Sequence, residues 1–87
     1  MKKLEKLLKA FANRRRLEII EFIRDSKSAS VGDIAARIRL SFKATSKHLG
    51  ILFASDLVDR EQTGLQMFYK IAPGKEKMID TILSILK

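Results

Sequence analysis

Cationic and small polar side chains are concentrated between residues 39 and 47 of the chain. If the second half of this stretch is helical, its basic residues lie on or near one face, toward the helix N-terminus. Lysine or arginine there can bind phosphates or guanine edges, serine can hydrogen-bond a base edge, and alanine can touch a thymine methyl group. The residues that predict such noncovalent recognition of nucleic acid are Arg39, Ser41, Lys43, Ala44, Ser46 and Lys47.

The charge distribution supports a polyanionic partner. Between Asp33 and Asp56 the chain has no acidic residue, although a solvated helix surface normally mixes both signs. The formal net charge of the 87-residue chain is +8, which favours DNA, RNA or, less readily, an anionic membrane surface. An enzyme is disfavoured, because one histidine, no cysteine and no Gly-rich phosphate loop leave few catalytic groups.

Two short helices joined by a tight turn are needed to present these residues. A capping-box pattern at Ser30 predicts a helix from Val31, and Ser41 is a suitable N-cap for a second helix. A turn at residues 39–40 separates the two. Residues 33–53 are therefore predicted to form a helix-turn-helix. The second helix has one buried face, opposite the basic residues, made of Thr45, Leu49 and Leu52.

An amphipathic first helix and a central apolar helix precede this unit. Residues 14–25 carry apolar side chains around more than half of the helical circumference, so this helix is expected at the centre of the core. Asn13 is predicted to be its N-cap. The basic run at residues 14–16 opposes the helix macrodipole and leaves two interpretations open. It contacts acidic partners or phosphates, or it is a solvated helix start with Arg16 paired to a glutamate or aspartate.

After Asp56 the sequence becomes rich in β-forming residues. Segments 57–62 and 65–71 flank a turn at residues 63–64, which predicts an antiparallel hairpin. Pro73 suits the first turn of a final helix.

Both predicted terminal helices carry a continuous apolar stripe. A domain of this size has a small core, so these stripes are expected to be covered by a partner. The predicted dimerisation segments are residues 1–12 and 73–87. Their stripe residues are Leu4, Leu7, Leu8, Phe11, Met78, Ile79, Ile82, Leu83, Ile85 and Leu86.

The predicted order of elements is that of a winged helix domain, mainly α-helical, with about five helices and a two-stranded wing. The chain resembles the ArsR (arsenic repressor-like) family of transcriptional regulators in the segments KAFANRRRLEII, DIAARIRLS, SKHLGIL and DLV, followed by FYKI. The resemblance extends from residue 9 to residue 71. It implies a homodimer, held through the first and last helices, that binds a pseudo-palindromic operator. It also makes the hairpin the wing, whose candidate contacts to the DNA backbone or minor groove are Arg60, Gln62, Thr63 and Gln66.

Five departures from the family pattern change what is expected of the site. One of them, Phe53, stands where polar residues are frequent and is expected to pack against a terminal helix. The family often has arginine where Leu65 stands at the wing tip, so the wing should bind more weakly. Gly50 stands where a charged residue is common and costs about 1 kcal/mol of helix stability relative to alanine. Phe42 is expected to pack over Leu40 rather than contact a base. Asp56 replaces a glycine at the turn into the wing, but aspartate tolerates the left-handed conformation.

No metal, cofactor or thiol chemistry is expected. The family's best-known metal sites use cysteines in the third helix, or aspartate and histidine in the last. This chain has no cysteine, and its last helix offers Glu76 and Asp80 but no histidine. The lone histidine, His48, lies in the family-like SKHL segment and is expected to be structural or to face DNA.

The sequence predicts a single domain over residues 1–87 that binds double-stranded DNA specifically as a transcriptional regulator, acting as a dimeric repressor without a cysteine metal site. Two alternatives stay open: a chromatin-like winged helix that binds nucleic acid without sequence preference, and a winged helix that docks a protein. No apolar run approaches the roughly 18 residues needed to span a bilayer, and no secretory signal is evident. A cytoplasmic, nucleoid-associated protein with no membrane partner is therefore expected.

Overall fold

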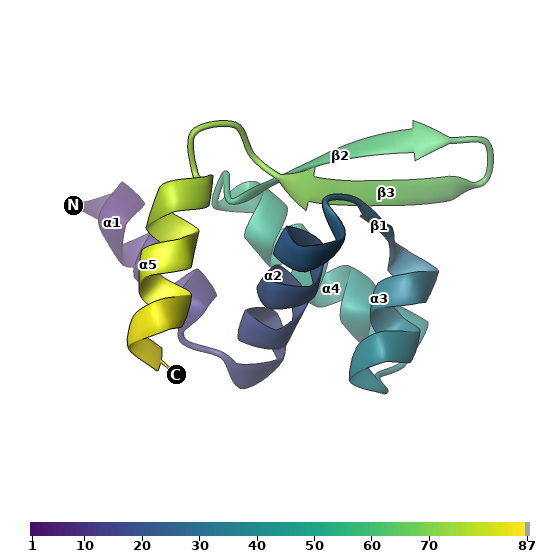
Figure 1. Cartoon of the computed structure of the whole chain (residues 1–87), viewed down its shortest axis with the longest axis horizontal. Helices are drawn as coiled ribbons and strands as arrows, with labels where there is room; N and C mark the ends of the chain where they lie inside the picture. The colour runs from purple at the N-terminus through teal and green to yellow at the C-terminus, as the bar shows by residue number, and fades with distance from the viewer. Residues whose placement is uncertain (87) are drawn as a thin grey trace.

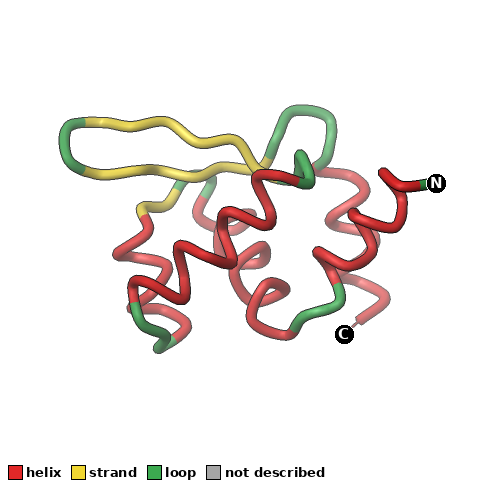
Figure 2. Tube along the Cα trace, turned by 180° about the vertical axis from the view of Figure 1, so that it is seen from behind, coloured by secondary structure: helices red, strands yellow, loops and turns green. Residues whose placement is uncertain are grey.

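The computed structural model describes residues 1–86, which form five helices and three strands (Figure 1). In chain order these are α1 (Lys2–Phe11), α2 (Arg14–Ser26), β1 (Ala29–Ser30), α3 (Val31–Ile38), α4 (Phe42–Ala54), β2 (Val58–Thr63), β3 (Gln66–Ile71) and α5 (Glu76–Leu86). The predicted order of helices and hairpin is confirmed. Helices α1 and α5 lie at one end of the molecule with both chain termini, whereas α3 and the tip of the hairpin lie toward the other end (Figures 1 and 2).

The three strands form one antiparallel sheet in the order β1-β3-β2. β2 and β3 pair along their whole length, from Val58 opposite Ile71 to Thr63 opposite Gln66. β1 was not predicted, because a two-residue strand is too short to show the alternation by which strands are found. It pairs with Phe68 and Tyr69 in the middle of β3, so the hairpin is anchored there and its tip projects beyond the helices (Figure 2).

Helix α2 is at the centre of the core, as predicted. Its Ile19, Ile20 and Ile23 have no exposed surface. Apolar side chains from all the other helices complete the same cluster. Burying one side chain of this size contributes about 1.5–3 kcal/mol, so the packing around α2 fixes the relative positions of the other helices.

The three predicted N-caps are confirmed by side chain–backbone hydrogen bonds. The Oδ1 atom of Asn13 accepts from the backbone N–H three residues later at 3.0 Å. The Oγ atoms of Ser30 and Ser41 do the same for α3 and α4, each at 3.1 Å. Each cap contributes about 1 kcal/mol and sets the residue at which its helix begins.

Two local predictions are wrong. The final helix begins at Glu76 rather than at Pro73, because Gly74, with a φ of 85°, turns the chain before the helix starts. The hairpin turn is one residue later than predicted, at residues 64–65. Gly64 has a φ of 63° there, a conformation in which a glycine avoids the strain of a Cβ atom.

The two terminal apolar stripes are only partly exposed. Phe11, Ile79 and Leu83 were predicted as dimer residues, but they are buried in the core of their own chain. Leu7, Met78 and Ile82 are partly buried against that core. Helical spacing shows which residues share a face, but it does not tell an internal core from an external partner. The strongly exposed members of the stripes are Leu4, Leu8, Ile85 and Leu86.

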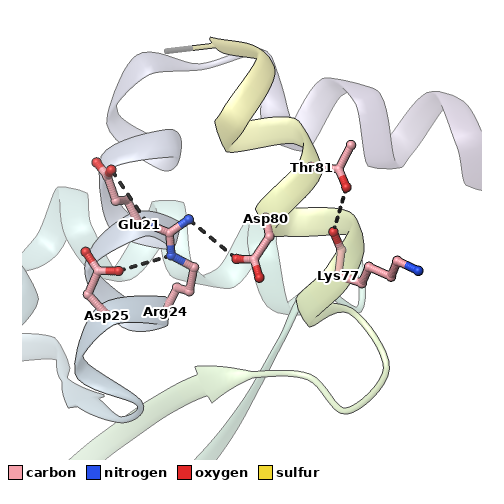
Figure 3. A network of polar contacts seen from close by, with 6 residues as sticks. All are labelled: Glu21, Arg24, Asp25, Lys77, Asp80 and Thr81. Carbon is pink, nitrogen blue, oxygen red and sulfur yellow. Dashed lines mark hydrogen bonds and ion pairs between the residues drawn. The ribbon is translucent and has the colours of Figure 1, made fainter.

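A set of ion pairs around Arg24 joins α2 to α5 (Figure 3). The guanidinium of Arg24 lies 3.1 Å from Asp25 and 3.9 Å from Glu21 within α2, and 3.4 Å from Asp80 of α5. The hydrogen bond to Asp25 and the surrounding carboxylates raise the pKa of Arg24. The contact between Arg24 and Asp80 supplements the apolar packing of Ile79 and Leu83 and holds α5 against α2.

One buried polar atom gives a stability prediction. The Oγ1 atom of Thr45 is fully buried in α4 and has no hydrogen-bond partner among residues 1–86. Thr45→Val removes this hydroxyl at nearly constant volume and should raise the free energy of unfolding by about 1 kcal/mol. That corresponds to an increase in Tm of about 4–8 °C by thermal denaturation. Thr45→Ala, which leaves a cavity, is the control and should give no increase; a lower Tm for the valine variant would contradict the assignment.

Candidate nucleic-acid interface

The N-terminal turn of α4 is the most exposed part of the helix-turn-helix. Ser41, Phe42 and Lys43 are all exposed, while Ser41 caps the helix through the N–H of Ala44. Backbone N–H groups of a first helical turn that are not used by the cap point out of the helix end, where the macrodipole favours an anion. This end of α4 can therefore bind a phosphate through its backbone as well as its side chains.

The two faces of α4 separate as the sequence predicts. Thr45, Leu49 and Leu52 have no exposed surface and pack inward. Lys47 is exposed on the opposite side, and Ala44 and Ser46 are half-buried at the edges. The candidate residues Lys43, Ala44, Ser46 and Lys47 thus lie within the first two turns of one helix.

Phe42 is largely exposed, at 63%. Its expected neighbour Leu40 is only half-buried at the edge of the core, so little apolar surface is available there to cover the ring. The expected packing of Phe42 over Leu40 stays a prediction.

The turn between α3 and α4 is held by a side chain from α2. Arg39 ends α3 in the left-handed conformation, with a φ of 57°, and Leu40 donates its N–H to the carbonyl of Ala35 at 3.0 Å. Arg15 donates from Nη1 to the carbonyl of Ile38 at 2.7 Å. A positive guanidinium at the C-terminal end of α3 is favoured by the helix dipole. Arg15 thus fixes the point from which the candidate DNA-contacting helix begins.

Arg16 has a comparable role for α1 and α4. It donates to the carbonyls of Ala10 at 2.8 Å and Lys9 at 3.0 Å, and its Nη1 lies 3.3 Å from Nδ1 of His48. The expected pairing of Arg16 with a glutamate or aspartate is not observed among residues 1–86, where Arg16 binds backbone carbonyls and an imidazole; its neighbour Arg15 has the acidic partner, Glu18, at 3.1 Å. His48 therefore contacts Arg16 within its own domain through one ring nitrogen.

The basic residues of the helix-turn-helix have no carboxylate partner among residues 1–86. Among residues 1–86, ion pairs occupy Lys9, Arg15 and Arg24, which lie on α1 and α2. In the same part of the chain no carboxylate pairs with Arg39, Lys43 or Lys47. Unpaired cations gathered on one surface give it a positive potential that attracts a polyanion.

The hairpin places its candidate residues at different distances from α4. Arg60 lies near its base, with the guanidinium carbon 3.9 Å from the ring centroid of Phe53 at the C-terminal end of α4. Gln62 and Thr63 are exposed near the tip, where Gln62 donates to the carbonyl of Gly64 at 3.3 Å. Leu65 is fully exposed in the turn. The tip is therefore polar and apolar rather than cationic.

Known proteins resemble this chain in sequence and in fold. Residues 13–60 match the family described as bacterial regulatory protein, arsR family. The transcriptional activator HlyU of Vibrio cholerae is 36% identical over 77 residues, which cover 88% of this chain and 70% of HlyU. This chain belongs to the ArsR family. The predicted family is thus confirmed, and the chain is a DNA-binding transcriptional regulator and not an enzyme.

Solved structures agree with this assignment. HlyU from Vibrio cholerae superposes with a TM-score of 0.85 at 34% identity, over 95% of this chain and 90% of that one. The transcriptional repressor PagR of Bacillus anthracis gives a TM-score of 0.79 at 26% identity, over 99% and 94% of the two chains. A homodimeric winged helix-turn-helix DNA-binding domain from Mycobacterium bovis gives 0.89 at 23% identity, over 98% and 79%. The predicted winged helix-turn-helix fold is confirmed.

Residues 1–86 contain no group of three or more histidine, cysteine, aspartate or glutamate side chains arranged to hold a metal ion. The helices in this part of the chain are too short or too polar to cross a membrane.

Gly50 allows the charge on the outer face of α4 to be tested. Gly50 follows Lys47 by three residues on the same face, and a Cβ atom added to it meets nothing within 4 Å. Gly50→Ala should raise the free energy of unfolding by about 1 kcal/mol without changing affinity for duplex DNA.

Gly50→Lys should give a similar stability and, in addition, tighter binding with a salt slope steeper by about one counterion. Thermal denaturation and fluorescence anisotropy across a salt series measure the two effects. Equal DNA affinity for the alanine and lysine variants would show that this face of α4 does not lie near the phosphates.

Proposed function

We propose that this ArsR-family protein is a homodimer that binds a pseudo-palindromic operator specifically and represses transcription by occupying it. The observation that carries the proposal is the pair of exposed, unpaired lysines, Lys43 and Lys47, on the first two turns of α4. They lie opposite the buried stripe, on a helix whose capped N-terminus is open to solvent.

In this proposal α4 is the recognition helix and enters the major groove with its N-terminal half. Lys43 and Lys47 contact phosphates or the O6 and N7 acceptors of guanine, and Ser46 donates to a base edge or phosphate. Ala44 touches a thymine methyl group. Ser41 and Arg39, at the turn before the helix, contact the sugar-phosphate backbone and fix the register of the protein on the duplex.

The wing has a smaller part in binding. Gln62 and Thr63, exposed near its tip, reach the backbone or the adjacent minor groove. Arg60 lies against Phe53 at the base, so its contact, if made, is to the phosphates closest to α4. The fully exposed Leu65 adds no charge at the tip, and the first two turns of α4 carry more of the affinity.

The proposed dimer interface is at the opposite end of the molecule from the turn between α3 and α4. Leu4 and Leu8 of α1 and Ile85 and Leu86 of α5 are all at least half exposed. An apolar groove of about 450 Å³ adjoins them and is lined in part by Phe11, Leu17, Leu83 and Leu86. The homodimeric domain from Mycobacterium bovis has the same fold, which supports a second copy as the partner.

The direction of regulation follows from where the operator lies. HlyU is an activator and PagR a repressor, so relatives of this chain act in both directions. A small domain that covers an operator represses if the operator overlaps a promoter. Such a protein acts on the nucleoid in the cytoplasm.

Lys43→Ala combined with Lys47→Ala should weaken duplex binding by at least tenfold at moderate salt and lower the salt slope by about two counterions. Both side chains are exposed, so circular dichroism and Tm should not change. Anisotropy titrations with excess random-sequence competitor measure the specific component.

Lys2→Ala combined with Lys3→Ala removes the same charge from α1 and is the matched control. It should leave specific binding nearly unchanged, because both lysines are exposed at the other end of the molecule (Figure 1). If the two double variants lose affinity equally, binding depends on net charge alone. The chromatin-like alternative would then be favoured.

Ile85→Asp should dissociate the dimer, since it places a carboxylate on the side chain that is 76% exposed on the apolar side of α5. Light scattering should report the monomer mass, and operator affinity should fall together with dimerisation. Ser84→Asp adds the same charge on the polar side of α5 and should remain dimeric. A parent protein that is monomeric at micromolar concentration would contradict the proposed interface.

A further inference from the structure

We propose that Arg16 is a positioning residue for DNA recognition: through His48 it holds the DNA-contacting turns of α4 in register with the C-terminal end of α1. The inference rests on the proposed function in one respect, the assignment of α4 as the recognition helix. It goes beyond that function by identifying the side chain that sets the helix in place.

Arg16 is itself fixed at two points on α1. Its Nε donates to the carbonyl of Ala10 at 2.8 Å and its Nη2 to that of Lys9 at 3.0 Å. The last carbonyls of a helix have few partners within the helix, and Ala10 is completely buried. A cation at this end is also favoured by the helix dipole. The guanidinium plane is therefore held by α1 before it reaches α4.

The third guanidinium nitrogen of Arg16, Nη1, is directed at the recognition helix. Nη1 of Arg16 lies 3.3 Å from Nδ1 of His48, and the two residues are 32 positions apart in the sequence. His48 directly follows Lys47 and is two residues after Ser46. A change in the position of His48 therefore moves the proposed contact residues with it, because a helix backbone is rigid over one turn.

The chemistry of the pair requires a neutral histidine. An arginine side chain has donors only, so Nδ1 of His48 must accept and the ring proton must be on Nε2. Burial is the main cause that lowers the pKa of His48 below 6.5, and the positive charges of Arg16, Lys47 and Arg15 lower it further. The charged groups that act on the ring from α2 and α4 are thus all cations.

These charges determine how the Arg16–His48 hydrogen bond depends on pH. Because the pKa of His48 is lower in the folded state than the ordinary value of 6.5, the hydrogen bond is complete above about pH 6.5. It is lost as the pH falls through the folded pKa. Protonation then removes the acceptor and places a positive charge against Arg16, so this link between α1 and α4 is lost at acidic pH.

The experiment uses substitutions that separate the hydrogen bond from side-chain volume. His48→Leu removes the acceptor, whereas the Oδ1 atom of His48→Asn can take the place of Nδ1. The probe is the duplex that the parent protein enriches from a random-sequence pool. At about pH 7.5 the leucine variant should bind this duplex about tenfold more weakly than the parent, a change within the range of measured couplings between sites. The asparagine variant should bind it about as tightly as the parent.

Arg16→Lys keeps the charge but not the three-way geometry. If Arg16 acts through His48, the Arg16→Lys substitution should change DNA affinity very little in the His48→Leu background. If the two residues act independently, their changes in binding free energy should add. Thermal denaturation of every variant separates a loss of fold from a loss of position. Additive effects, or equal binding by the leucine and asparagine variants, would overturn the proposal.

The dependence of DNA affinity on pH distinguishes a positioning role from a merely structural one. His48 is the only histidine, so its imidazole NMR signals report its tautomer and pKa without ambiguity. Relative to His48→Asn, the parent should lose affinity at the pKa measured by NMR. A profile identical to that of the asparagine variant, or a ring proton on Nδ1, would refute the contact. A parent protein that enriches no sequence from the pool would instead refute the proposed function, and with it a role for Arg16 in specific recognition.

Discussion

Two adjacent arginines at the start of α2 hold the C-terminal ends of two other helices, and the arrangement of the domain depends on these contacts. Arg15 binds the last carbonyl of α3, and Arg16 binds two carbonyls at the end of α1. Cations at the N-terminus of α2 oppose its own dipole, but here they also lie at the negative ends of α1 and α3. The unfavourable interaction of these arginines with the dipole of α2 is thus offset by their favourable interactions with the dipoles of α1 and α3.

The packing of the core determines which face of α4 is exposed. Apolar packing around Ile19, Ile20 and Ile23 buries one face of α4, and the described residues leave Lys43 and Lys47 on the opposite face exposed. Ion pairs among residues 1–86 involve cations of α1 and α2, whereas the lysines of α4 have none. The end of the molecule with α1 and α5 therefore exposes apolar side chains beside the lysines of α1, whereas the first two turns of α4 expose Lys43 and Lys47. This division is what a small regulator needs to bind a second copy and DNA at the same time.

Features that depend on local sequence could be predicted, and those that depend on distant contacts could not. The caps at Asn13, Ser30 and Ser41, the buried stripe of α4 and the left-handed Asp56 follow from short-range rules. β1 is too short to show a period. Phe11, Ile79 and Leu83 have the spacing of a helix face, but spacing does not say whether that face meets its own core. Arg15 and Arg16 bind backbone carbonyls, which carry no sequence signal, in addition to the side chains of Glu18 and His48.

The central claim is that the first two turns of α4 read a specific, symmetric DNA site. Selection of bound duplexes from a random-sequence pool, followed by sequencing, tests it most directly. We expect enrichment of a pseudo-palindrome whose half-sites are about one helical turn, or a multiple of it, apart. The combined Lys43→Ala and Lys47→Ala variant should lose this enrichment. A pool that stays random after repeated rounds, although the protein retains duplex in low salt, would contradict the claim.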